Sequence, residues 1–200
     1  DGTISNPKDG IVRSINYALN ALGYDERSES ELVQYIGPPL DKTFEVLAGT
    51  KDPALITSLV YKYRERYAAT GFSENTLYTG VVDGLETLCK KFPLAICTSK
   101  RVDFAENILA LFEISHLFQV VSGGEIGISK SQQLESLLAR GSIGADSIMV
   151  GDRDVDMIAA RDNGLTSVAV LWGFGDREEL SRESPDMILE HPSQLAKEIG

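Results

Sequence analysis

From Gly80 onward, short apolar runs alternate with longer stretches of helical periodicity, and this alternation restricts the possible folds more than any other feature of the chain. The apolar runs lie at 94–97, 118–121, 147–150, 167–171 and 187–189. The helical stretches lie near 82–89, 103–111, 131–139, 155–163 and 193–199. Strands that alternate with helices are joined by right-handed crossovers into a parallel sheet. The sequence therefore predicts a Rossmann-like α/β fold for this part of the chain.

The segment between Pro7 and Tyr78 has a helical pattern instead. Pro7 opens a stretch in which apolar residues recur at helical spacing. Ser28 and Glu31 match a capping box at the start of a second, shorter helix. A third helix is predicted over 52–71, where an Asp-Pro pair marks the start. No strand is predicted in this segment, so a helical block precedes the α/β block.

The first three residues, Asp1-Gly2-Thr3, have the pattern of a loop that directly follows a strand, because a Gly-Thr pair here precedes a helix start. That strand is not in the sequence. A parallel sheet that lacks an inner strand exposes unpaired strand edges and apolar faces. We therefore expect residues upstream of Asp1 that supply the missing strand.

Composition limits the class of protein. A chain of 200 residues suits one domain, or one core with a modest insertion. The net charge of −11 disfavours general affinity for nucleic acid or for an anionic membrane. No apolar run approaches the roughly 20 residues that cross a bilayer. Two cysteines, Cys89 and Cys97, are too few for a disulfide scaffold and lack zinc-type spacing, which favours a reducing, cytoplasmic location.

Polar side chains directly follow several of the predicted strands. In parallel α/β sheets, ligands bind beyond the carboxyl ends of the strands, so residues at these positions are candidates for a site. The residues concerned are Asp1, Thr98, Ser99, Lys100, Lys130, Asp152 and Asp156. Carboxylates favour magnesium, and lysine favours phosphate oxygens. The set predicts a phosphate bound beside a hard divalent cation.

Each of these residues also has a simpler interpretation. Thr98 and Ser99 could cap the next helix, and Lys130 could be an ordinary solvated lysine. Asp152 could be a helix N-cap, with Asp156 (or its neighbour Asp154) as a favourable charge in the first helical turn. The occurrence of all of them at strand ends, in this order, favours a functional site over these separate explanations.

The same residues resemble the four motifs of the haloacid dehalogenase superfamily. Those motifs are Asp-x-Asp-Gly-Thr, a Thr or Ser that closes a strand, a lysine, and Gly-Asp with a second Asp four residues on. The matching residues are Asp1-Gly2-Thr3, Thr98 in LAICTSK, Lys130, and Gly151-Asp152 with Asp156 in VGDRDVDM.

The resemblance covers essentially the whole chain and points to one branch of the superfamily. The runs IGPPL, LYTGVVDGLETL and VLWGFGDREEL are similar to the phosphoglycolate-phosphatase-like branch, in which a helical cap is inserted after the first motif. The resemblance therefore implies a Rossmann-like parallel-sheet core over 1–7 and 79–200, with an all-helical cap over 8–78. The cap is expected to close over the site, with the Gly37-Pro38-Pro39 turn reaching toward the substrate.

The resemblance also implies a role for each site residue. The nucleophile is expected two positions before Asp1, outside the sequence, and forms an aspartyl-phosphate. Asp1 is expected to be the general acid–base and to bind Mg²⁺ through its backbone carbonyl. Asp152 is expected to ligate the metal, and Asp156 to ligate it or to orient a metal-bound water. Lys130 is implied as a catalytic and phosphate-binding residue.

The remaining candidates are Thr98 and Ser99 for binding phosphate, and Lys100 and Arg153 for binding an anionic part of the substrate. The sequence departs from the family pattern at two positions. Asn6 stands where relatives often have an acidic residue, and Ser131 replaces the proline that usually follows the motif lysine.

The function implied by the resemblance is a Mg²⁺-dependent phosphatase that acts on a small phosphorylated metabolite such as phosphoglycolate. A nucleotide 5′-phosphatase or a sugar-phosphate mutase on the same scaffold are alternatives. A catalytically silent binding module is a further alternative if the chain truly starts at Asp1. No nucleic-acid or membrane partner is expected, and the protein is expected to be a monomer or a homodimer.

Overall fold

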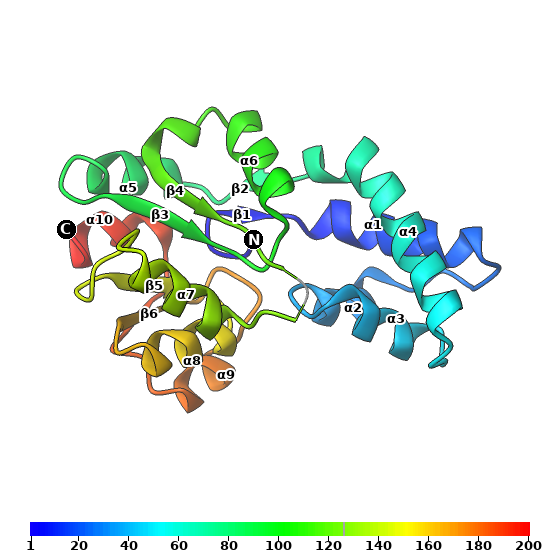
Figure 1. Cartoon of the computed structure of the whole chain (residues 1–200). Coiled ribbons are helices and arrows are strands. Elements are labelled where there is room, and N and C mark those ends of the chain that lie inside the picture. The colour runs from blue at the N-terminus through cyan, green and yellow to red at the C-terminus, as the bar shows by residue number, and fades with distance from the viewer. Residues whose placement is uncertain (126) are drawn as a thin grey trace. The chain divides into compact units, whose positions relative to one another are not determined.

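The computed structural model describes residues 1–125 and 127–200, which divide into two compact units (Figure 1). The core unit consists of Asp1–Asn6 and Leu77–Gly200. The helical unit consists of Pro7–Thr76. The chain thus enters the core, leaves it for the helical unit, and returns to the core for the remaining residues.

The core unit contains two parallel sheets. The first pairs β3 (Leu94–Cys97) with β4 (Phe118–Ser122). The second has the order β5-β6-β7, formed by Ile148–Gly151, Thr166–Val170 and Met187–Leu189. Among the described residues, β3 pairs only with β4, and β5 pairs only with β6, so each sheet ends on an edge strand.

Helices cover both faces of the three-stranded sheet, and the alternation of side chains along β6 shows this directly. Val168 and Val170 pack in one apolar cluster, whereas Ala169 between them packs in another. The helices that contribute to the cluster of Val168 and Val170 are α5 (Val81–Leu88), α6 (Val102–Leu111), which contacts β4, and α10 (Leu195–Glu198). The helices on the second face are α7 (Lys130–Ala139), α8 (Asp154–Asp162) and α9 (Arg177–Arg182), which lie together in Figure 1.

In the helical unit, two helices pack on the longest one. Its helices are α1 (Lys8–Ala21), α2 (Glu29–Leu32), α3 (Leu40–Leu47) and α4 (Pro53–Ala69), and both α1 and α3 pack on α4. Phe44 and Tyr63 meet edge to face with ring centroids 6.4 Å apart, and Tyr63 stacks on Tyr67 at 5.4 Å. Gly10 permits a close approach, since a Cβ there would lie 2.0 Å from the carbonyl oxygen of Gly71.

The strands and helices predicted after Gly80 are present, with bounds that differ by one or two residues at most. The capping box of Ser28 and Glu31 is formed, but the helix tightens into a 3₁₀ turn at Val33–Tyr35. Helices α3 and α9 were not predicted from the sequence. Among the described residues, no helix has the length and apolar character that a membrane span requires.

The prediction that no strand lies between Pro7 and Tyr78 is wrong. A two-residue strand, β2 (Thr76–Leu77), pairs with β1 (Ser5–Asn6) in a small separate sheet. A strand of two residues is too short to show the alternation by which strands are recognised in a sequence.

The packing of α7 yields a test of the core. Leu137 is fully buried there, whereas Leu111, at the end of α6, is 45% exposed. We expect Leu137→Ala to lower the free energy of unfolding by about 3 kcal/mol, because it leaves a cavity. Leu111→Ala is the matched control and should change it by less than about 0.5 kcal/mol. Urea unfolding measures both, and equal effects of the two substitutions would contradict this packing.

Candidate active site

Asp152 follows β5 directly and, like Asp156, is almost fully enclosed, with 3% of its surface exposed. One carboxylate oxygen accepts a hydrogen bond from Thr3 Oγ1 at 3.0 Å, and the other accepts one from the Phe174 backbone N–H at 3.0 Å. Burial raises the pKa of Asp152 above its ordinary value, although the Phe174 hydrogen bond opposes this shift. A nearby cation would therefore stabilise the ionised form of Asp152.

Glycines allow two loops to close around Asp152. Gly2 has a φ of +74°, and a Cβ at this position would lie 2.0 Å from Asp152 Oδ2. A Cβ at Gly173 would lie 2.3 Å from Asp152 Cβ. The loop that follows β6 and the loop at the start of the chain thus both touch this side chain, and neither position has room for a larger residue.

The starting loop is held in place by a side chain from the loop after β6. Trp172 Nε1 donates a hydrogen bond to the Thr3 carbonyl oxygen at 2.9 Å. Thr3 in turn donates its hydroxyl to Asp152. A chain of contacts therefore links Trp172, the Asp1-Gly2-Thr3 loop and the carboxylate at the end of β5.

Asp156 and Lys130 form a buried ion pair, with side-chain exposures of 4% and 14%. Asp156 Oδ1 contacts Lys130 Nζ, and Oδ2 accepts the backbone N–H groups of Asp152 and Arg153, both at 3.0 Å. Burial alone would lower the pKa of Lys130, but the Asp156 carboxylate reverses this effect and the pKa is raised. Lys130 is therefore a charged lysine fixed at the ends of the strands.

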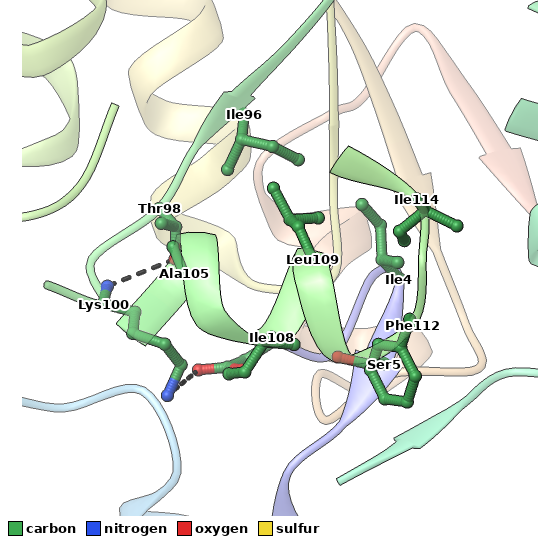
Figure 2. A pocket seen from close by; sticks show the side chains of 11 residues that line it. Ile4, Ser5, Ile96, Thr98, Lys100, Ala105, Ile108, Leu109, Phe112 and Ile114 are labelled. Atoms are coloured by element: carbon green, nitrogen blue, oxygen red, sulfur yellow. Dashed lines mark hydrogen bonds and ion pairs between the residues drawn. The ribbon is translucent and has the colours of Figure 1, made fainter. Parts of the chain in front are cut away.

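Asp1, Thr98 and Lys100 form a second group of polar residues, of which Thr98 and Lys100 are labelled in Figure 2. Lys100 Nζ lies 3.0 Å from Asp1 Oδ2, and the Lys100 backbone N–H donates to Thr98 Oγ1 at 3.2 Å. All three line a cavity whose other wall is apolar and is supplied by α6, by residues just after it, and by Ile4 and Ile96. The apolar lining residues are Ile4, Ile96, Ala105, Ile108, Leu109, Phe112 and Ile114.

The simpler interpretations of the site residues are mostly wrong. The N-cap of α6 is Arg101, so neither Thr98 nor Ser99 caps that helix. Lys130 is mostly buried and ion-paired, with 14% of its side chain exposed, rather than solvated. The N-cap of α8 is Arg153 rather than Asp152. Asp154 and Asp156 keep the simpler role of charges in the first turn of α8, where Asp156 also accepts backbone N–H groups.

Two of the predicted residues, Ser99 and Arg153, are less well placed than the others to bind a substrate. Ser99 is exposed. Arg153, predicted as a contact for a substrate anion, instead forms an ion pair with α9, with its Nε 2.7 Å from Glu179 Oε1. The same oxygen accepts the backbone N–H of Asp154 at 3.1 Å, so Glu179 fixes the loop that carries Asp152.

The donor set fits a magnesium ion in part. Asp152 is a desolvated carboxylate with one hydrogen bond on each oxygen, which leaves lone pairs for a cation. Asp156 Oδ1 is paired with the Lys130 ammonium group and Oδ2 accepts two backbone N–H groups, so Asp156 offers less to a cation than Asp152 does. In residues 1–125 and 127–200, no three His, Cys, Asp or Glu side chains form a metal-binding group. Magnesium often binds through only one or two carboxylates, with waters and substrate phosphate completing its shell.

Several residues around the site were not predicted from the sequence. Trp172 and Glu179 lie in a run that was noticed only for its family likeness, and their contacts become visible only in three dimensions. Gln133 was not singled out either, although its side-chain amide contacts the ends of both β3 and β4. A polar residue in a helix carries no sequence signal for such a contact.

Comparison with known proteins identifies the family. The family profile described as haloacid dehalogenase-like hydrolase matches residues 1–170. A 5′-nucleotidase of Pseudomonas aeruginosa is 35% identical over 190 residues, covering 92% of this chain and 86% of that protein. A phosphoglycolate phosphatase of Vibrio parahaemolyticus is 29% identical over 216 residues, covering 100% of this chain and 93% of that protein.

A solved structure supports the same assignment. The crystal structure of a predicted phosphatase from Clostridium acetobutylicum superposes with a TM-score of 0.90 at 32% identity, covering 100% of this chain and 94% of that one. The predicted fold class and the predicted enzyme class, a phosphoric monoester hydrolase, are confirmed at the level of the family. The chain belongs to the haloacid dehalogenase-like hydrolase family.

Proposed function

We propose that this protein is a Mg²⁺-dependent phosphatase that hydrolyses a phosphate monoester of a small metabolite through an aspartyl-phosphate. The observation that carries the proposal is the buried Lys130–Asp156 ion pair beside the desolvated Asp152 carboxylate. A fixed ammonium group and a desolvated carboxylate are the two parts needed to hold a phosphoryl group next to a metal ion.

Two residues are proposed to hold the phosphoryl oxygens. Lys130 presents its ammonium group at the ends of the strands, in an orientation fixed by Asp156. Thr98 closes β3, and its hydroxyl accepts the backbone N–H of Lys100, which leaves the hydroxyl hydrogen free to donate to an anion. Ser99 remains a weaker candidate because it is exposed and lies beyond the strand end.

Asp1 and Asp152 are proposed for the acid–base and metal roles. Asp1 would protonate the leaving alkoxide and then take a proton from the attacking water. Its ion pair with Lys100 fixes one carboxylate oxygen, which favours a defined orientation for this transfer. Asp152 would hold Mg²⁺, together with the Asp1 carbonyl oxygen. When bound, the ion neutralises negative charge on the phosphoryl group.

The nucleophile is proposed to be an aspartate two positions before Asp1, at the end of a strand that lies between β3 and β5. The split of the sheet supports this placement, because β3 and β5 are both edge strands in the described residues. The carboxylate oxygen would bond to phosphorus while the ester oxygen leaves with a proton. Water would then cleave the acyl phosphate, which releases inorganic phosphate and restores the carboxylate.

The substrate is proposed to be a small phosphate ester, with two candidates. Phosphoglycolate is favoured by the family branch that the motifs resemble and by the phosphoglycolate phosphatase relative. A 5′-nucleotide is the second candidate, favoured by the 5′-nucleotidase relative at 35% identity. The helical unit is proposed to act as a cap that selects between such substrates, as caps and lids do in other enzymes.

The test is phosphate release from a panel of esters by protein that includes the residues preceding Asp1. The panel contains phosphoglycolate, 5′-nucleotides and sugar phosphates, each with Mg²⁺ and with chelator. We expect release that chelator abolishes, and the best ester identifies the substrate class. A folded protein that releases phosphate from none of them would overturn the enzyme proposal in favour of a binding module.

Asp152→Asn tests the proposed metal ligand. The substitution keeps the shape of the side chain but removes the charge, so we expect phosphate release to fall by roughly 100-fold or more. The stabilisation of the folded protein by Mg²⁺, measured as a rise in melting temperature, should also be lost. Asp146→Asn is the control, because Asp146 is exposed and precedes β5, whereas Asp152 follows it. Unchanged Mg²⁺ stabilisation in Asp152→Asn would rule out this ligand.

Lys130→Met tests the buried ion pair. The substitution leaves the Asp156 carboxylate buried without its cation, so we expect the free energy of unfolding to fall by about 3 kcal/mol. Adding Asp156→Asn to the same chain should recover much of this stability, because the side chain at position 156 is then neutral and no longer needs the Lys130 ammonium group. Activity should be lost in both variants, since the phosphate-binding ammonium group is absent. Recovery of activity along with stability would show that Lys130 is purely structural.

A further inference from the structure

Gln133 contacts both strand ends that carry the proposed phosphate site. It lies in the first turn of α7 and is 8% exposed. Its Nε2 lies 2.9 Å from the Ser122 carbonyl oxygen and 2.9 Å from Ser122 Oγ. The same nitrogen lies 2.9 Å from the Gly123 carbonyl oxygen and 3.3 Å from the Thr98 carbonyl oxygen. One buried amide group thus reaches the ends of β3 and β4 together.

These contacts are not needed to start the helix. The N-terminus of α7 is already closed by a capping box, in which Ser129 Oγ accepts the Gln132 N–H and Gln132 Oε1 accepts the Ser129 N–H. The amide of Gln133 has two hydrogens and four acceptors within reach. The Gln133 amide therefore donates its hydrogen bonds to the strand ends and not to its own helix.

The two loops that Gln133 joins are also in close contact with each other. Gly124 N–H donates to the Lys100 carbonyl oxygen at 2.8 Å, and Thr98 N–H donates to the Ser122 carbonyl oxygen at 3.0 Å. A Cβ at Gly124 would lie 2.3 Å from the Ser99 carbonyl oxygen. The loop after β4 therefore fixes the position of the turn after β3. Gln133 donates hydrogen bonds to both segments.

We propose that Gln133 is a positioning residue of the phosphate site, which fixes the turn carrying Thr98 and Lys100 by bonding to the ends of β3 and β4. This inference rests on the proposed phosphatase function and extends it to a residue that does not itself touch the substrate. A displacement of about 1 Å in a binding group can change a rate by about 100-fold. A buried amide that ties two loops together limits such displacements.

The experiment measures the affinity for inorganic phosphate, as a competitive inhibitor, in protein that includes the residues preceding Asp1. Gln133→Met keeps the length of the side chain but removes both donor hydrogens. We expect the inhibition constant and the KM for the best ester to rise by about tenfold. Leu137→Ala is the matched control, because it destabilises the same helix but removes no hydrogen bond to the strand ends, and it should leave both constants within about twofold.

The possible outcomes separate this inference from the proposed function. If the parent protein hydrolyses an ester and Gln133→Met binds phosphate as well as the parent, Gln133 is only structural and the inference fails alone. If the parent protein hydrolyses no ester, the proposed function fails and the inference fails with it. If Gln133→Met does not fold, Gln133→Asn takes its place. The shorter Asn side chain cannot reach both strand ends, so we again expect phosphate to bind about tenfold more weakly. Phosphate affinity equal to that of the parent protein would overturn the inference.

Discussion

The buried Lys130–Asp156 ion pair is the interaction on which the rest of the site depends. An isolated carboxylate buried to this extent would be strongly destabilising, so Asp156 requires the ammonium group from α7. The other oxygen of Asp156 accepts the N–H groups of Asp152 and Arg153, and this fixes the turn between β5 and α8. One carboxylate thus sets the positions of the proposed phosphate-binding lysine and of the proposed metal ligand. A change at Asp156 would affect both groups at once.

Close backbone packing, more than side-chain chemistry, determines how the remaining loops meet this turn. Gly2 and Gly173 bring two loops against Asp152, where any side chain would collide with the carboxylate. Glu179 bonds to the same turn from α9, and Gln133 bonds to the neighbouring strand ends from α7. The turn after β5 and the turn after β3 are therefore held by helices on the second face of the sheet, whereas Trp172 holds the Asp1-Gly2-Thr3 loop. This arrangement makes the geometry of the site a property of the whole core unit.

The sequence predicted the core well because its signals are local. Apolar runs of three to five residues between helical stretches placed β3 to β7 to within one or two residues, and the polar residues after those strands do lie at the strand ends. The features that the sequence did not predict depend on contacts between residues that are far apart in the chain. The ion pair of Arg153 with Glu179 and the four contacts of Gln133 have no periodicity or spacing that marks them. The strand pair β1-β2 was not predicted because each strand has only two residues, too few to show the alternation of a strand.

The charges of the site bear directly on the proposed magnesium ion. Asp1, Asp152 and Asp156 contribute three negative charges, and Lys100 and Lys130 contribute two positive ones, each already paired with a carboxylate. Arg153 adds no net charge, because Glu179 neutralises it. The site is thus negative by one charge within a protein of net charge −11, before the proposed nucleophile is added. A phosphate dianion would be repelled from such a site, so a divalent cation at Asp152 supplies the attraction that the lysines alone cannot.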